Sequence, residues 1–258
     1  MAETRPRAAA AIAATAVATL AVGAGLARER PLDAEWLALA GTIASLSFAA
    51  LAVMGAFLVP APPRDTLALV RPRDGAPSLS LLLAGQLGFG VMVSAGLAWT
   101  GVVEGSSLEQ LDQAMAAAAL PALALLAIGV ALLPGIAEEL LFRGLLLGAL
   151  LRRIGAPAAI ALSTLPFALL HLDPAHILGA GALGLYLAGV RVTTGSTLAC
   201  ILCHVANNAL AIALSTQSWP GWIDWIVLPL ASLFAVAGLL GMRRAWPAPS
   251  VAADGRPG

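Results

Sequence analysis

The sequence contains no lysine, and charged residues of any kind make up only 11% of its 258 positions. A soluble domain carries roughly a quarter charged residues, so this scarcity excludes a soluble globular protein. The net charge of zero gives no support to a nucleic-acid partner. Two cysteines are too few for a disulfide framework. Hydrophobic residues make up 60% of the chain, which predicts an integral, multi-pass membrane protein without a separate hydrophilic domain.

Long apolar runs predict an all-α membrane bundle of about eight transmembrane helices. A span needs about 20 apolar residues, and the candidate runs lie at 8–27, 34–59, 78–103, 116–151, 157–172, 175–191, 196–214 and 222–242. The fourth run is too long for one straight span, and Pro134-Gly135 predicts a division into one helix ending near 133 and a second over 136–151. Residues 1–27 resemble a signal peptide, but the length of the run and the "RERP" that follows favour a retained first helix.

The arginines predict the orientation of the bundle. Eleven of the 14 fall on the N-terminal segment, alternate loops and the tail, two fall on the opposite side, and Arg143 lies within a span. Cytoplasmic loops carry the excess of positive residues, so we expect both termini in the cytoplasm. We also expect one domain over 1–258, ending in a disordered cytoplasmic tail at 243–258.

Strongly polar residues within the predicted spans all fall between positions 138 and 208, namely Glu138, Glu139, Arg143, His171, His204, Asn207 and Asn208. Ionisable residues inside a membrane are costly and are functional candidates by default. Glu139 and Arg143 are four residues apart on one helix face, where they can neutralise each other. Glu138 points about 100° away from that face. The two adjacent glutamates therefore have different predicted roles, one structural and one free.

Helix geometry predicts that these residues meet at one depth. At a rise of about 1.5 Å per residue, Glu138 and His171 each lie about 20 Å from the cytoplasmic end of their helices. His204 and Asn208, also four residues apart, lie about 12 and 18 Å along theirs. A buried polar network that only joins helices is the alternative, and a lone Glu–Arg pair is often of that kind. The combination from three helices favours chemistry.

The chemistry that fits this set is the hydrolysis of a carbonyl compound. Glu138 with His171 can activate water as a general base, while His204 and Asn208 can donate hydrogen bonds to an oxyanion. Alternatively, Glu138, His171 and His204 can bind Zn²⁺ and leave one coordination position open. Spacing alone does not separate these two mechanisms.

Three short motifs carry a resemblance to a known family. "EELLFR", "FALLH" and "HVANN" resemble, in order, the EExxxR, FxxxH and HxxxN motifs of the CPBP (CAAX-protease and bacteriocin-processing, Abi-type) intramembrane proteases. The resemblance implies an eight-helix bundle with catalytic core helices over 116–214 and peptide-bond hydrolysis within the membrane. It implies Glu138 and His171 as water-activating residues, His204 and Asn208 as oxyanion ligands, and Glu139, Arg143 and Phe167 as supports of the site. Because Asn208 is a poor Zn²⁺ ligand, we favour a mechanism without metal or other cofactor, with zinc as the alternative.

The expected partners are the lipid bilayer and a membrane-anchored peptide or protein substrate. The alanine- and arginine-biased composition indicates a bacterial protein of the inner (plasma) membrane, where processing of sorting signals or bacteriocin-like peptides is a more natural role than CAAX processing. A non-proteolytic immunity or scaffold protein on the same fold stays an alternative. A proton-coupled transporter is disfavoured, because the chain lacks paired broken helices in two related halves.

Two further segments carry weaker expectations. His176, in the "DPAH" connection, is expected to be a loop or cap residue and not a ligand. The segment "GSSLEQLDQA" is expected to form an amphipathic lid over the non-cytoplasmic end.

Overall fold

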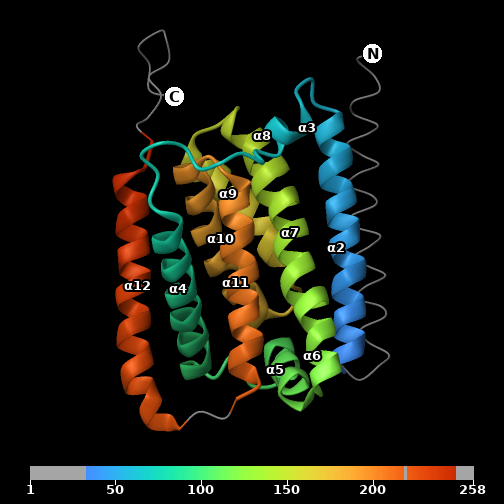
Figure 1. Ribbon diagram of the computed structural model, residues 1–258, viewed down its shortest axis with the longest axis vertical. Coiled ribbons are helices and arrows are strands. Elements are labelled where there is room, and N and C mark those ends of the chain that lie inside the picture. The colour runs from blue at the N-terminus through green and yellow to red at the C-terminus, as the bar shows by residue number, and fades with distance from the viewer. Residues whose placement is uncertain (1–32, 218–219, 248–258) are drawn as a thin grey trace.

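The computed structural model describes residues 33–217 and 220–247, and these ranges contain helices and no strand. In chain order the elements are α2 (Ala34–Phe57), α3 (Pro63–Thr66), α4 (Leu79–Trp99), α5 (Ser107–Ala117), α6 (Leu120–Leu126), η1 (Ala127–Leu132), α7 (Leu133–Glu139), η2 (Leu140–Leu146), α8 (Leu147–Leu151), α9 (Ala156–Leu169), α10 (Pro174–Thr194), α11 (Thr197–Ser215), η3 (Gly221–Ile223) and α12 (Asp224–Arg244). The long helices stand side by side, with α3 and α5 at opposite ends of the bundle (Figure 1).

Six of the described helices are long and apolar enough to cross a membrane. They are α2, α4, the continuous rod from α6 to α8, α10, α11 and α12 with the short η3 before it. Many of their leucines, valines and isoleucines are exposed, as expected of helices that face lipid. The predicted polytopic all-α bundle is therefore confirmed. The predicted span at 8–27 lies outside the described residues, and the count of eight and the cytoplasmic termini stay predictions.

The prediction that Pro134-Gly135 divides the fourth run into two helices is wrong. Leu120–Leu151 is one rod of 32 residues. The π-helical segments η1 and η2 flank α7, and the Leu133 N–H bonds to the Ile128 carbonyl five residues back. The π-turn places Pro134 in the first turn of α7, a position where its missing N–H and its ring are tolerated. A local change from α-helix to π-helix thus accommodates the proline without ending the rod.

A glycine lets the rod approach α11 closely. A Cβ on Gly135 would lie only 3.0 Å from the backbone nitrogen of Val205. The Val205 Cγ2 would lie closer still, at 2.6 Å, so a larger residue at position 135 would displace both this side chain and the α11 backbone behind it. Small residues permit this kind of close helix contact in membranes. Val205 follows His204 directly, so the contact sets the distance between the polar residues of the two helices.

The turn between α9 and α10 is short and strained. Leu172 has a φ of 61°, a left-handed conformation that is rare for a bulky residue. Asp173 is the N-cap of α10, and its side chain accepts a hydrogen bond from the His176 backbone N–H at 3.1 Å. His176 therefore lies in the first turn of α10 and not in the connection where we expected it.

The predicted amphipathic segment forms α5 at the end of the bundle opposite α3 (Figure 1). Ser106 caps this helix by accepting from the Glu109 N–H, and the Glu109 carboxylate accepts from the Gly105 N–H. The Ser107 N–H donates to Asp173 at 3.3 Å, which ties the start of α5 to the start of α10. This end also carries the exposed Trp99 and Trp225, whose rings are suited to a membrane interface.

Candidate active site

The Glu139 carboxylate is fully buried and accepts two hydrogen bonds on a single oxygen. Arg143 Nη1 donates to Glu139 Oε1 at 2.9 Å, so the predicted i,i+4 ion pair is present. His204 Nδ1, from α11, lies 2.8 Å from the same oxygen. Since a carboxylate oxygen accepts, this contact gives the His204 tautomer with hydrogen on Nδ1. Glu139 thus orients the imidazole of His204.

Arg143 is neutralised and enclosed within the bundle. Its side chain is 1% exposed, and its second terminal nitrogen donates to the Gly184 carbonyl of α10 at 3.0 Å. The guanidinium carbon lies 4.2 Å from the centroid of the Phe167 ring, a cation–π arrangement. A Cβ at Gly184 would lie 3.0 Å from this guanidinium. Arg143 therefore joins the rod to α9 and α10 in a space that only glycine leaves open.

Glu138 differs from its neighbour in both burial and bonding. Its side chain is 16% exposed, and its Oε2 lies 3.9 Å from His204 Nε2. That separation is too long for a direct hydrogen bond but suits a bridging water. With Nδ1 of His204 bound to Glu139, the other ring nitrogen faces Glu138. His204 therefore lies between the two glutamates, a relation that the sequence analysis did not foresee.

His171 follows the C-terminal end of α9. Its Nδ1 lies 3.1 Å from the Phe167 carbonyl, which can only accept, so the hydrogen is on Nδ1 and Nε2 is free. The Phe167 ring contacts both imidazoles edge-on, with centroid distances of 5.4 Å to His171 and 6.1 Å to His204. The support role of Phe167 stays a prediction. Glu138 forms its ion-pair contact with His204 and has no corresponding contact with His171 among the described residues.

Asn208 is held by a carbonyl that a proline leaves free. Its Nδ2 donates to the Val130 carbonyl at 3.3 Å. In an α-helix that carbonyl would accept from the N–H of residue 134, and Pro134 has none. Asn207 Nδ2 lies 3.5 Å from Asn208 Oδ1, at the long limit of a hydrogen bond. The amide predicted to bind an oxyanion is therefore oriented by η1 and by its own neighbour.

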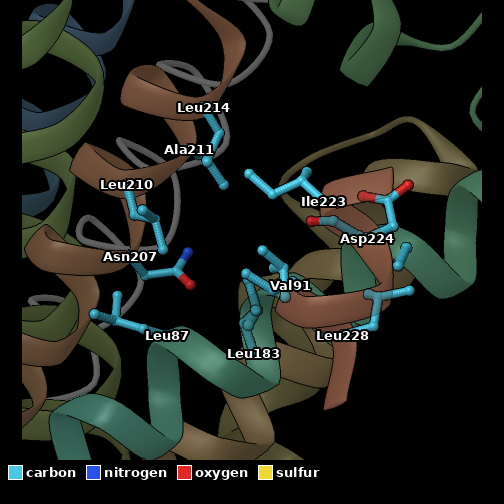
Figure 2. Close-up of a pocket in the computed structure, with 14 residues that line it drawn as sticks. Leu87, Val91, Leu183, Asn207, Leu210, Ala211, Leu214, Ile223, Asp224 and Leu228 are labelled. Carbon is cyan, nitrogen blue, oxygen red and sulfur yellow. The ribbon is translucent and has the colours of Figure 1, made fainter. Parts of the chain in front are cut away.

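A cavity of about 320 Å³ adjoins this amide pair on the side of α4 and α12. Figure 2 shows the Asn207 amide directed into the cavity toward Val91. Most of its lining is aliphatic, from α4, α11 and α12 with one residue of α10. None of Glu138, His171, His204 and Asn208 lines it, so it neighbours the polar cluster and does not contain it.

The residues of the zinc alternative do not form a ligand set. Glu138, His171 and His204 are among the described residues, and those residues include no group of three His, Cys, Asp or Glu side chains close enough to hold a metal ion. We therefore derive no chemical step through a metal.

Sequence reasoning missed one ring of the cluster. His176 packs on His171, with ring centroids 4.3 Å apart. The strained Leu172 turn brings them together across the start of α10. The two histidines are five residues apart in the sequence, a spacing typical of no single helix face, so no local pattern signals the contact.

Comparison with known proteins supports the motif-based resemblance. Residues 120–210 match the family model described as Rce1-like, type II CAAX prenyl endopeptidase Rce1-like. No curated protein and no solved structure matches the chain. The matched residues run from the start of the rod to α11 and contain all three motifs. The part of the chain that carries the polar cluster is thus Rce1-like, and the predicted resemblance to the CPBP proteases is confirmed.

Proposed function

We propose that this protein is an intramembrane endopeptidase that hydrolyses a peptide bond in a membrane-associated protein or peptide. The observation that carries the proposal is the position of His204 between two adjacent glutamates. Its Nδ1 bonds to Glu139 at 2.8 Å and its Nε2 lies 3.9 Å from Glu138. A carboxylate that orients an imidazole toward the reacting atoms is the arrangement of many hydrolases.

Glu138 acts as the general base in this proposal. A water between Glu138 Oε2 and His204 Nε2 gives one proton to the carboxylate, and its oxygen attacks the carbonyl carbon of the substrate. The carbonyl becomes an oxyanion. When the C–N bond breaks, Glu138 returns the proton to the leaving nitrogen. His171, whose Nε2 is free, assists in positioning the water.

His204 and Asn208 stabilise the oxyanion. The Asn208 amide has two N–H groups, so one stays on the Val130 carbonyl while the other donates to the new charge. In this proposal His204 holds a second proton, on Nε2, before the water attacks, so that Nδ1 donates to Glu139 and Nε2 donates to the oxyanion. The Arg143 ion pair keeps Glu139 in place, so Glu139, Arg143 and Phe167 support the site without contacting the substrate.

The cavity beside Asn207 is the space we assign to an apolar side chain of the substrate. Most of its lining is aliphatic, with Ser94, Asn207 and Asp224 as the polar residues, and Asn207 adjoins the residue to which we assign oxyanion binding. Pockets of this size with few polar groups are typical binding sites between the helices of bundles. Sorting signals, bacteriocin-like peptides and CAAX-like tails all supply apolar residues.

The test compares protein termini in cells that carry the native protein or Glu138→Ala at equal membrane levels. Mass spectrometry of the membrane fraction should find one or more new termini with the native protein alone. Identical sets of termini, together with a phenotype that Glu138→Ala leaves intact, would instead support the scaffold alternative.

Metal dependence is tested on the purified protein with a substrate found in that way. We expect cleavage to continue after treatment with a chelator and dialysis. Loss of cleavage that stoichiometric Zn²⁺ restores would establish the zinc alternative.

A further inference from the structure

Two guanidinium groups meet over Gly148 at the end of the bundle where α3 and α8 lie (Figure 1). A Cβ on Gly148 would lie 3.7 Å from Arg152 Nη1 and 3.9 Å from Arg191 Nη2. The Thr66 carbonyl would lie 3.7 Å from the same point, and no atom outside the local helix backbone would be closer. A methyl group on Gly148 would therefore be in ordinary van der Waals contact with groups of α3, α10 and the residue that follows α8, and these groups bound the space over the glycine.

Neither guanidinium has an anionic partner within residues 33–217 and 220–247. The ion pairs of this part of the chain belong to Glu138, Glu139, Arg143 and His204. Arg191 Nε is buried without a hydrogen-bond partner. The Thr66 hydroxyl, on a residue that is 4% exposed, is likewise buried and unpartnered. Unsatisfied buried donors are costly, and two adjacent cations repel each other.

Two other arginines at this end each donate one hydrogen bond to a backbone carbonyl. Arg64 Nε donates to the Leu69 carbonyl at 3.2 Å, and Arg73 Nη2 donates to the Ala245 carbonyl at 3.0 Å. Asp65, next to Thr66, is exposed and forms no ion pair with Arg152 or Arg191. Arg152 and Arg191 differ from these arginines because their guanidinium groups lie near one point over Gly148 and because Arg191 Nε is buried without a partner.

We propose that Arg152 and Arg191 form a binding site over Gly148 for the phosphate group of an anionic phospholipid. The site offers two guanidinium forks, and guanidinium groups match the geometry of phosphate oxygens. Basic pockets between transmembrane helices at the membrane surface are known to take anionic head groups. Gly148 leaves room for the phosphate because it has no side chain.

The depth of the site favours a lipid over the peptide substrate. Arg152 directly follows the last residue of the membrane-spanning rod, and Arg191 lies in the last turn of α10. Both positions correspond to the level of lipid head groups. Arg152 is 14 residues from Glu138, or about 21 Å along the rod. A released peptide of a few residues does not extend over that distance, so this site is independent of the proposed reaction.

Binding is measured on the purified full-length protein in a neutral detergent, from the thermal unfolding midpoint during titration. The probes are dioleoyl phosphatidylglycerol, dioleoyl phosphatidylcholine and inorganic phosphate. We expect a saturable rise with phosphatidylglycerol alone. The apparent affinity should fall at least tenfold in Arg152→Gln/Arg191→Gln and stay unchanged in Arg153→Gln, since Arg153 lies at the same helix end and is not among the groups over Gly148. An equal affinity for phosphatidylglycerol in the native protein, the double variant and Arg153→Gln would overturn the proposed site.

A response to inorganic phosphate that matches that to phosphatidylglycerol, and that the double variant loses, would overturn the lipid assignment in favour of the free ion. Gly148→Val provides a second variant that keeps both arginines. Its Cβ fits at ordinary contact distance, while its methyl groups occupy the space that we assign to the phosphate. We expect the same tenfold loss, and native affinity in a folded Gly148→Val protein would refute the proposal even if the double variant does not fold.

Discussion

Glu138 and Glu139 are adjacent on α7 but lie in two different regions of the bundle. Glu139 is fully buried, accepts from Arg143 and His204, and faces α10 and α11. Glu138 is 16% exposed and has a single polar neighbour at 3.9 Å. The first carboxylate has its charge matched by the protein. The second has free lone pairs and room beside it for water, which are the properties of a general base.

The two glutamates show that adjacent charged residues on one helix can differ in how fully the protein compensates the free energy of burying their charge. A buried charge is tolerated when a partner and hydrogen bonds accompany it. Glu139 meets that condition through Oε1, which accepts from Arg143 and His204, while its Oε2 is buried without a partner. Glu138 has no direct hydrogen bond and lies on the next face of α7, about 100° away, and this is the carboxylate that we propose as the general base.

Glu138→Gln should have the largest effect on activity and should show most clearly that the two carboxylates differ in role. We expect cleavage to fall by about 10²- to 10⁴-fold, because the amide cannot accept the proton from water. The thermal unfolding midpoint should stay near the native value, since Glu138 has no direct bond to lose. Glu139→Gln is the matched control and should lower the midpoint. The comparison fails if Glu138→Gln lowers the midpoint and Glu139→Gln does not.

Arg143→Met tests the structural face of the comparison. It leaves the Glu139 carboxylate buried with His204 as its only remaining partner, and breaking a buried pair costs about 3–5 kcal/mol. The free energy of unfolding in mixed micelles should fall by this order. Glu139→Leu/Arg143→Met removes both charges and should recover a large part of the loss. No recovery in the double variant would mean that Arg143 acts mainly through Gly184 and Phe167.

Local helix geometry explains which parts of the site the sequence could predict. The Glu139–Arg143 contact follows from a spacing of four residues on one helix, and the apolar runs predicted α2, α4, α10, α11 and α12 closely. Both features depend on residues that are near in the sequence. The position of His204 depends instead on the approach of α11 to α7 at Gly135, which no periodicity in either segment reveals.

Pro134 shows how a correct local rule can lead to a wrong conclusion. The missing N–H and the bulk of the ring do disturb an α-helix, but the rod responds with the π-turn η1 and continues. The disturbance leaves the Val130 carbonyl for Asn208. Sequence reasoning treated the proline as a boundary, whereas in the fold the rod continues through it and the Val130 carbonyl accepts from Asn208, 78 residues away in the sequence.

Pro134→Ala therefore tests whether the bond from Asn208 to the Val130 carbonyl affects catalysis. The alanine N–H would compete with Asn208 for the Val130 carbonyl, and the loss of one hydrogen bond corresponds to a decrease in kcat of about 3- to 10-fold. Asn208→Ala removes the amide itself and should cost about 10²- to 10³-fold. Pro229→Ala, at a proline inside α12, is the control and should leave kcat unchanged. Native kcat in Pro134→Ala would show that the contact does not orient Asn208.

The smallest effect is expected at His176, which touches neither glutamate and contacts the site through His171 alone. Ring packing at a centroid distance of 4.3 Å is worth about 0.5–1.5 kcal/mol. His176→Ala should therefore lower kcat by about 2- to 10-fold with KM unchanged, because the freed His171 ring spends less time in its reactive orientation. His176→Phe keeps a ring against His171 and should restore most of kcat, whereas His176→Gln should not. Rescue by glutamine and not by phenylalanine would show that His176 acts through its ring nitrogens and not through ring packing. His176 would then be a second polar side chain, beside His171, that supports the site around Glu138.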